Sequence, residues 1–118
     1  MDTGIHTLQA RVADASVIHP VYRKDLQPGD WLRITTKNSV YTLCALEGDL
    51  YAVTGGWFDR KGLSPTTTTI AGCTWGGSVL KHDIVAAPGL CLEFGNQVVT
   101  TRIQDVRVFR ARSREPLN

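Results

Sequence analysis

Short β-forming segments, separated by turns that contain Gly, Pro or Asn, follow one another from Asp30 onward, and the loop from Gly55 to Pro65 is the only long connection of the first half. Parallel β-α-β units need crossovers of a dozen or more residues, so these connections are too short for them. The pattern predicts an all-β fold, an antiparallel meander that closes into a small barrel or a compact sandwich. The segments expected as strands are DWLRITT, SVYTLCAL, LYAVT, TTTTIAGCTW, SVLKHDIV, LCLEF and VVTTRIQDVRVF.

The length of 118 residues fits a single domain. We divide it into an N-terminal segment (1–26), a β-barrel core (27–110) and a basic tail (111–118). Within the N-terminal segment, Ile5, Leu8, Val12 and Ala15 recur at near-helical spacing. A short N-terminal helix over residues 4–16 is therefore one interpretation, beside a barrel without it.

The Gly76-Gly77 pair lies between two β-forming segments and predicts the tip of a two-residue hairpin. In that register Cys73 lies opposite Leu80, and Cys73 and His82 share the more apolar face. We expect this face to point to the core.

Cys73 and His82 lie diagonally across the predicted hairpin, so a thiol nucleophile activated by a histidine is one hypothesis. Asp83 points to the opposite face and cannot orient His82. A buried thiol beside a histidine bonded to a backbone carbonyl is the plainer interpretation, and we prefer it. Gly72 is expected to mark a bulge or a close approach of two backbones.

Two aromatic residues, Trp57 and Phe58, stand in the loop from Gly55 to Pro65. Together with Trp75 they are candidates for the wall of a ligand groove, because binding residues concentrate on loops of a rigid scaffold. The alternative is that they fold back and plug the end of the barrel.

The positive charge is concentrated at the C-terminal end. Residues 102–118 hold five arginines and two acidic residues, whereas the other 101 residues hold eight basic and nine acidic ones. A nucleic-acid-binding barrel is therefore a further alternative. The residues that would carry it are Arg102, Arg107, Arg110, Arg112 and Arg114. The net charge of only +2 leads us to expect no strong binding to DNA or RNA.

The three cysteines, Cys44, Cys73 and Cys91, have no spacing typical of a metal site or a redox pair. We expect three free, slowly reacting thiols in a reducing, cytoplasmic setting.

The N-terminal residues do not resemble a signal peptide, and no apolar run is long enough to span a membrane. No metal ligand spacing and no phosphate-binding loop is present, so we expect no metal and no cofactor.

The C-terminal segment VRVFRARS carries apolar side chains on both faces, which predicts an exposed sheet edge. Such an edge needs a cover. Pairing across a two-fold axis would give a homodimer, and the N-terminal segment lying over the edge would close the molecule within one chain.

The pattern TTTIAGCTWGGS, then GLCLEF, then VVTTRI resembles one found in small SH3-like β-barrel bacterial proteins of no assigned function. The segment LQPGDWLRI, from Leu26 to Ile34, similarly resembles the entry strand of SH3-like barrels. The resemblance implies a shared β-scaffold and no particular chemistry. From these observations we expect a non-catalytic binding or interaction module, with a small-molecule or peptide ligand and no membrane partner.

Overall fold

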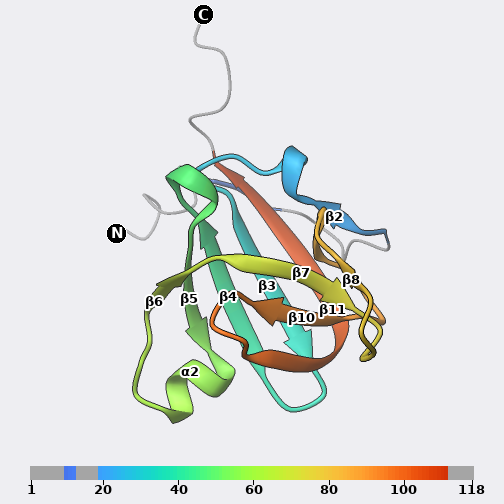
Figure 1. The fold of residues 1–118 in the computed structure, drawn as a ribbon. Helices are drawn as coiled ribbons and strands as arrows, with labels where there is room; N and C mark the ends of the chain where they lie inside the picture. Colours follow the sequence, from blue (N-terminus) through green and yellow to red (C-terminus); the bar gives the residue numbers. More distant parts are fainter. Residues whose placement is uncertain (1–9, 13–18, 112–118) are drawn as a thin grey trace, which may run out of the picture.

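The structure, a computed structural model, describes the backbone of residues 10–12 and all of residues 19–111. It is mostly β, as the alternation predicts. Antiparallel strands form one sheet in the order β6-β5-β4-β3-β11-β10-β7-β8, with β1 paired to β11, and β2 and β9 form a separate pair (Figure 1). The strands are β1 (Ala10–Val12), β2 (Val21–Tyr22), β3 (Trp31–Thr36), β4 (Val40–Ala45), β5 (Tyr51–Gly55), β6 (Thr66–Thr68), β7 (Ile70–Thr74), β8 (Leu80–Lys81), β9 (Ile84–Ala86), β10 (Cys91–Phe94) and β11 (Val99–Ala111). The helical segments are η1 (Arg23–Asp25), η2 (Glu47–Asp49) and α2 (Gly56–Arg60).

The alternation of the sequence corresponds to two faces of the sheet. In β3, Leu32 and Ile34 are fully buried, whereas Trp31 and Arg33 are exposed on the other face. β10 follows the same rule, with Leu92 buried and Glu93 half-buried. The inner face forms one hydrophobic core, whose largest fully buried apolar side chains are Phe58, Phe94, Leu32, Ile34, Leu43, Leu92, Val53, Val85 and Val106.

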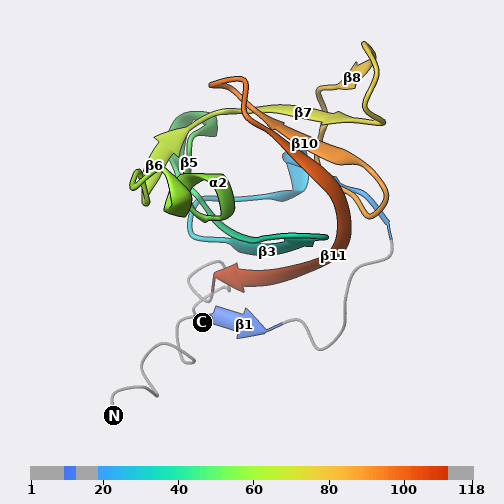
Figure 2. The ribbon, with the colours of Figure 1, turned by 90° about the horizontal axis from the view of Figure 1, so that it is seen from below.

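The two ends of the sheet are linked by one continuous stretch of chain. β6 pairs with β5, β7 pairs with β10, and only Thr69 separates β6 from β7. Figure 2 shows the sheet curving round the core. In β7, the register against β10 shifts between Gly72 and Ile70, and Gly72 has a φ of 145°. A side chain there would collide with the carbonyl oxygen of Lys81, so the expected bulge and close approach at Gly72 are both confirmed.

β11 lies between β3 and β10, and the border expected at its C-terminal segment is covered by β1 at residues 109–111. Its first half pairs with β10 and its second half with β3, and the register shift between Ile103 and Asp105 marks where the strand bends (Figure 2). Val106 and Val108 are buried in the core. β1 pairs with residues 109–111, which is the intramolecular cover that the sequence offered as the alternative to a dimer.

The proposed N-terminal helix is wrong at residues 10–12, which form β1. The rest of the segment 4–16 lies outside the described residues. The backbone groups of residues 10–12 form hydrogen bonds with β11, and such tertiary pairing overrides a weak helical periodicity.

Gly76 and Gly77 lie in the loop between β7 and β8, as predicted, but the register of the hairpin differs by one residue. The last pair is Thr74 with Leu80, and Cys73 lies opposite Lys81 rather than Leu80. The hydroxyl of Thr74 accepts a bond from Gly76 N (3.1 Å) and donates one to Gly77 O (3.2 Å). These side-chain hydrogen bonds hold a loop that is wider than a two-residue turn. Because the strand register differs by one residue from the predicted one, each residue of the second strand lies on the opposite face of the sheet from the one predicted.

Asp30, in the PGD turn before β3, is fully buried and joins the start of the sheet to the end of β11. Oδ1 accepts a hydrogen bond from Ala111 N (2.9 Å). Oδ2 accepts one from Gln27 N (2.9 Å) and lies 3.2 Å from the Arg110 guanidinium. Nothing in the local sequence QPGD points to this role.

Candidate functional site

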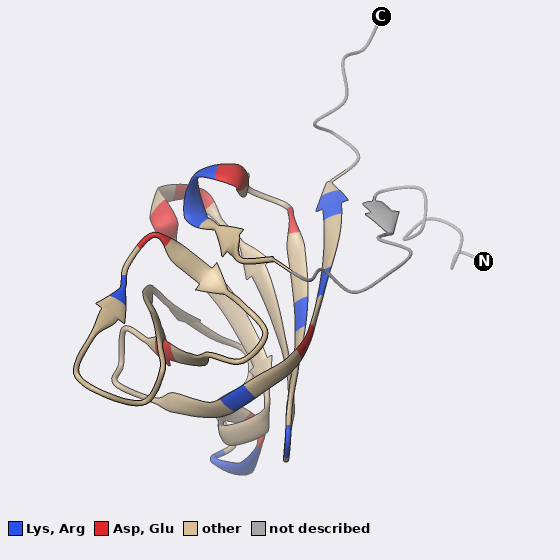
Figure 3. Ribbon diagram, turned by 90° about the vertical axis from the view of Figure 1, so that its right-hand side faces the viewer, with Lys and Arg blue, Asp and Glu red and all other residues tan. Residues whose placement is uncertain are grey.

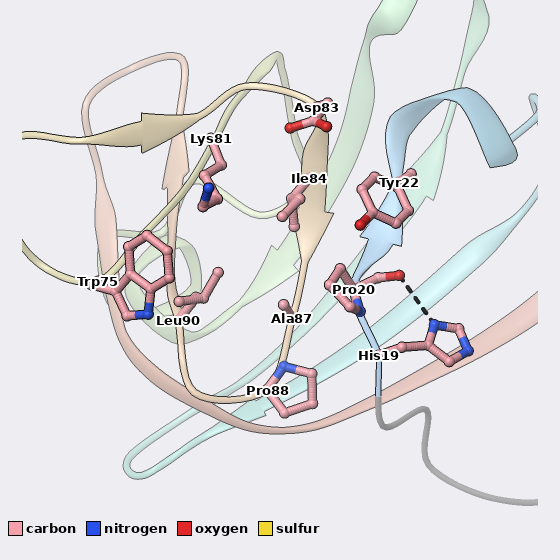
Figure 4. Close-up of a pocket in the computed structure, with 10 residues that line it drawn as sticks. All are labelled: His19, Pro20, Tyr22, Trp75, Lys81, Asp83, Ile84, Ala87, Pro88 and Leu90. Carbon is pink, nitrogen blue, oxygen red and sulfur yellow. Dashed lines mark hydrogen bonds between the residues drawn. The ribbon is translucent and has the colours of Figure 1, made fainter.

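A cleft of about 440 Å³ lies between the β7–β8 loop, β2 and the turn that follows β9 (Figure 4). Trp75 and Tyr22 stand at opposite sides of it, and Ile84, Ala87 and Leu90 lie between them. The cleft is lined by His19, Pro20, Tyr22, Trp75, Lys81, Asp83, Ile84, Ala87, Pro88 and Leu90. Two aromatic rings over an apolar floor, with a few charged groups at the rim, are typical of a ligand site.

Trp75 is held from its backbone while its ring stays open to solvent. Arg102 donates to Trp75 O (2.9 Å) and to Gly89 O (2.8 Å), so one guanidinium joins the two loops that border the cleft. Lys81 Nζ lies 5.0 Å from the centre of the indole ring, within the range of a cation–π contact. The side chain remains 54% exposed, which is unusual for a tryptophan and leaves its ring available to a partner.

Arg23 fixes the opposite side of the cleft. Its backbone N–H donates to Asp83 O (2.8 Å), and its guanidinium donates to Ile70 O (3.0 Å) and to His82 O. These bonds tie the short strand β2, and with it Tyr22, to β7 and β9. No sequence motif indicates this role, because Arg23 lies 47 residues from Ile70 and 59 from His82.

A second cleft, of about 600 Å³, shares Tyr22 and Asp83 with the first. Its other lining residues are Arg23, Lys24, Leu26, Asp49 and His82. Arg23 is already bonded to two carbonyl groups, and the other cation of this cleft, Lys24, has its Nζ 6.0 Å from the centre of the Tyr22 ring. We regard it as an extension of the first cleft past Tyr22.

Cys73 and His82 lie in different environments in the structure. Cys73 is fully buried, as predicted, with Sγ 3.4 Å from Val85 O. His82 is exposed, so the prediction that it faces the core is wrong; its Nδ1 lies 3.2 Å from Ala71 O. Burial raises the pKa of Cys73 to about 12, so the thiolate fraction at neutral pH is on the order of 10⁻⁵. All three cysteines are free, as expected, and burial also raises the pKa of Cys44.

The free energy of unfolding is expected to fall as the pH rises above 9, by about 1.4 kcal/mol per pH unit for the proton that Cys73 retains. In the unfolded chain the thiol ionises near its ordinary pKa of 9.0, whereas in the folded protein its pKa is about 12. Between these two values the unfolded state binds fewer protons, so rising pH favours unfolding.

Urea denaturation of the wild type and of Cys73→Ala at about pH 8 and about pH 10.5 measures this effect. The variant has no thiol at position 73, so the difference in stability between the two proteins is expected to move in its favour at the higher pH. A difference that stays constant with pH would contradict the raised pKa.

The three aromatic candidates do not form one groove. Phe58 is fully buried in the core, against Phe94 at 5.0 Å and Tyr41 at 6.3 Å between ring centres, so it plugs the interior. Trp57 is half-buried against Phe58 in α2. Of the three, only Trp75 lines the cleft. Its aromatic partner, Tyr22, was missed, because a two-residue strand leaves almost no periodic signal.

The described arginines of the C-terminal end mostly hold the fold together. Arg102 bonds Trp75 O and Gly89 O, and Arg110 donates to Asp25 O (2.7 Å) as well as to buried Asp30. Arg107 pairs with Asp105 at 3.2 Å. Arg112 and Arg114 lie outside the described residues.

Comparison with known protein families, with curated proteins and with solved structures finds no match to this chain. Within residues 19–111, no group of three or more His, Cys, Asp or Glu side chains is arranged to hold a metal ion. Among the described residues there is also no helix with the length and hydropathy needed to cross a bilayer.

Proposed function

We propose that the protein is a small SH3-like barrel that acts as a non-catalytic binding module, with the cleft between Trp75 and Tyr22 as its ligand site. The barrel is supported by the chain segment 66–74, which pairs with β5 at one end and β10 at the other. The binding role rests above all on Trp75, which stays 54% exposed although Arg102 holds its backbone in place.

The ligand class follows from the dimensions and chemistry of the cleft. A volume of about 440 Å³ suits a small molecule or two or three residues of a peptide. The flat ring of Trp75 and the apolar floor favour a planar or apolar group, while Lys81 and Asp83 at the rim can orient a polar one. A reducing compartment is consistent with three free thiols.

Replacing Trp75 with alanine is expected to weaken ligand binding at least about tenfold, because the largest contact surface of the cleft is lost. The probes are N-acetyl dipeptide amides that carry an aromatic side chain or proline. Protein labelled with 5-fluorotryptophan has three indole signals, and the signal of Trp75 is the one expected to shift when a probe binds.

Trp31→Ala is the matched control, because Trp31 is also an exposed tryptophan, 47% accessible, but lies on the outer face of β3. It is expected to leave probe binding unchanged. If every probe leaves the Trp75 signal unmoved at millimolar concentration, or if Trp31→Ala weakens binding as much as Trp75→Ala, the cleft is not the site.

A further inference from the structure

The outer face of the sheet carries a second aromatic surface, away from the cleft and from the core. Trp31 of β3 lies directly opposite Phe109 of β11, and Arg33 lies directly opposite Arg107 on the same two strands. Opposite residues of antiparallel strands share a face, so these four side chains form one group, which we call the outer platform. Trp31 and Arg33 are exposed, and Phe109 and Arg107 are half-buried.

The arginine pair of the outer platform is a local conflict in the sheet. Like charges directly opposite one another on paired strands are destabilising. Asp105 offsets one of them through its contact with Arg107 at 3.2 Å. Arg33 has no ion-pair partner within residues 19–111, and its guanidinium lies 5.9 Å from the centre of the Phe109 ring. An anionic partner would relieve the repulsion.

We propose that the outer platform binds single-stranded nucleic acid, with bases stacking on Trp31 and Phe109 and phosphates contacting Arg33 and Arg107. Exposed aromatic rings beside basic side chains are the two elements that such surfaces combine. Basic positions recur along β11 (Figure 3), and the outward-facing residues of the neighbouring strand β4, Val40, Thr42 and Cys44, carry no charge. The sheet brings these residues together from positions 74 or more apart in the chain.

A single strand fits this surface better than a duplex. Bases in a duplex stack on one another and hide their faces, so they cannot rest on Trp31 and Phe109. With two arginines at the centre and a net charge of +2, the affinity is expected to be modest and salt-dependent, with a dissociation constant of about 10⁻⁶–10⁻⁴ M at low salt. This agrees with the expectation that the protein does not bind nucleic acids strongly.

Fluorescence anisotropy with fluorescein-labelled dT12, at about 20 mM and about 150 mM salt, tests the proposal. Trp31→Ala is expected to weaken binding about tenfold, and Trp31→Phe to keep most of it, because the ring is retained. The double variant Arg33→Gln/Arg107→Gln is expected to lower the slope of log affinity against log salt by about 1.4, which corresponds to two phosphate contacts.

Two matched controls distinguish binding at the outer platform from non-specific electrostatic binding and from binding in the cleft. Lys61→Gln removes one exposed positive charge at the end of α2, and Trp75→Ala removes the exposed indole of the cleft. Both are expected to bind dT12 as the wild type does. The proposal is overturned if dT12 does not bind at low salt. It also fails if Lys61→Gln reduces the affinity as much as Arg33→Gln alone, or if a dT12·dA12 duplex or a polyglutamate peptide binds as well as the single strand. The dipeptide probes of the cleft are independent of all these outcomes.

Discussion

Asp30→Asn is expected to lower the free energy of unfolding by about 2–4 kcal/mol. Asp30 is fully buried, and its two carboxylate oxygens accept bonds from Ala111 N, Gln27 N and the Arg110 guanidinium. Asparagine replaces one of these acceptors with an N–H donor, so a buried backbone N–H faces another donor. Arg110 also loses its counter-charge.

Urea denaturation gives the difference in stability, and the amide exchange rate of Ala111 reports directly on the bond at the end of β11. Asp25→Asn is the matched control. Asp25 is exposed and contributes only its backbone carbonyl to the Arg110 contact, so the same change of side chain there is expected to cost less than about 0.5 kcal/mol. Equal stability of the two variants would show that Asp30 does not hold the strand ends together.

Phe58→Ala is expected to destabilise the protein by about 3–5 kcal/mol. Phe58 is fully buried in α2 and makes edge-on contacts with Phe94 at 5.0 Å, with Trp57 at 5.2 Å and with Tyr41 at 6.3 Å between ring centres. Removing its ring leaves a cavity that these neighbours cannot fill without leaving their own positions.

Chemical denaturation at neutral pH measures the loss, and Leu63→Ala serves as the control in the same connection between β5 and β6. Leu63 is 48% exposed, so its truncation is expected to change stability by about 0.5 kcal/mol or less. If Phe58→Ala costs no more than Leu63→Ala, the ring does not belong to the core, and the loop aromatics return as candidates for a ligand groove.

The strands could be predicted because local chemistry sets them. Turns such as QPGD, KNS and AAPG carry residues that favour tight reversal, and the alternation of Leu32 and Ile34 with Trp31 and Arg33 fixes which face is buried. Each of these signals spans only a few residues. They give the elements and the class of fold, and they leave open which strands become neighbours.

The features that the sequence did not predict depend on contacts between distant parts of the chain or on hydrogen bonds of single side chains. The hairpin register moved by one residue because the hydroxyl of Thr74 holds the loop, and that slip brought His82 to the surface. Nothing within the turn at Asp30 reveals a partner 81 residues away at Ala111. The choice of β1 as the cover of the C-terminal segment is likewise not encoded locally.

The candidate site was foreseen only at Trp75. Its other wall, Tyr22, depends on Arg23 reaching across to the carbonyls of Ile70 and His82, a tertiary arrangement without a sequence motif. The outer platform likewise becomes visible only when β3 and β11 are paired in register. Exposed aromatic residues in strands are therefore interpretable only once their cross-strand neighbours are known.

The position of β11 also determines when the protein can fold as it is made. This strand is the last of the described chain to leave the ribosome, yet it joins β3 on one side to β10 on the other. Until then, the meander β3–β5 and the strands β7 and β10 form two nascent halves, each with an uncovered apolar face and an unpaired border. The complete sheet is therefore expected to form only after residues 99–111 have emerged.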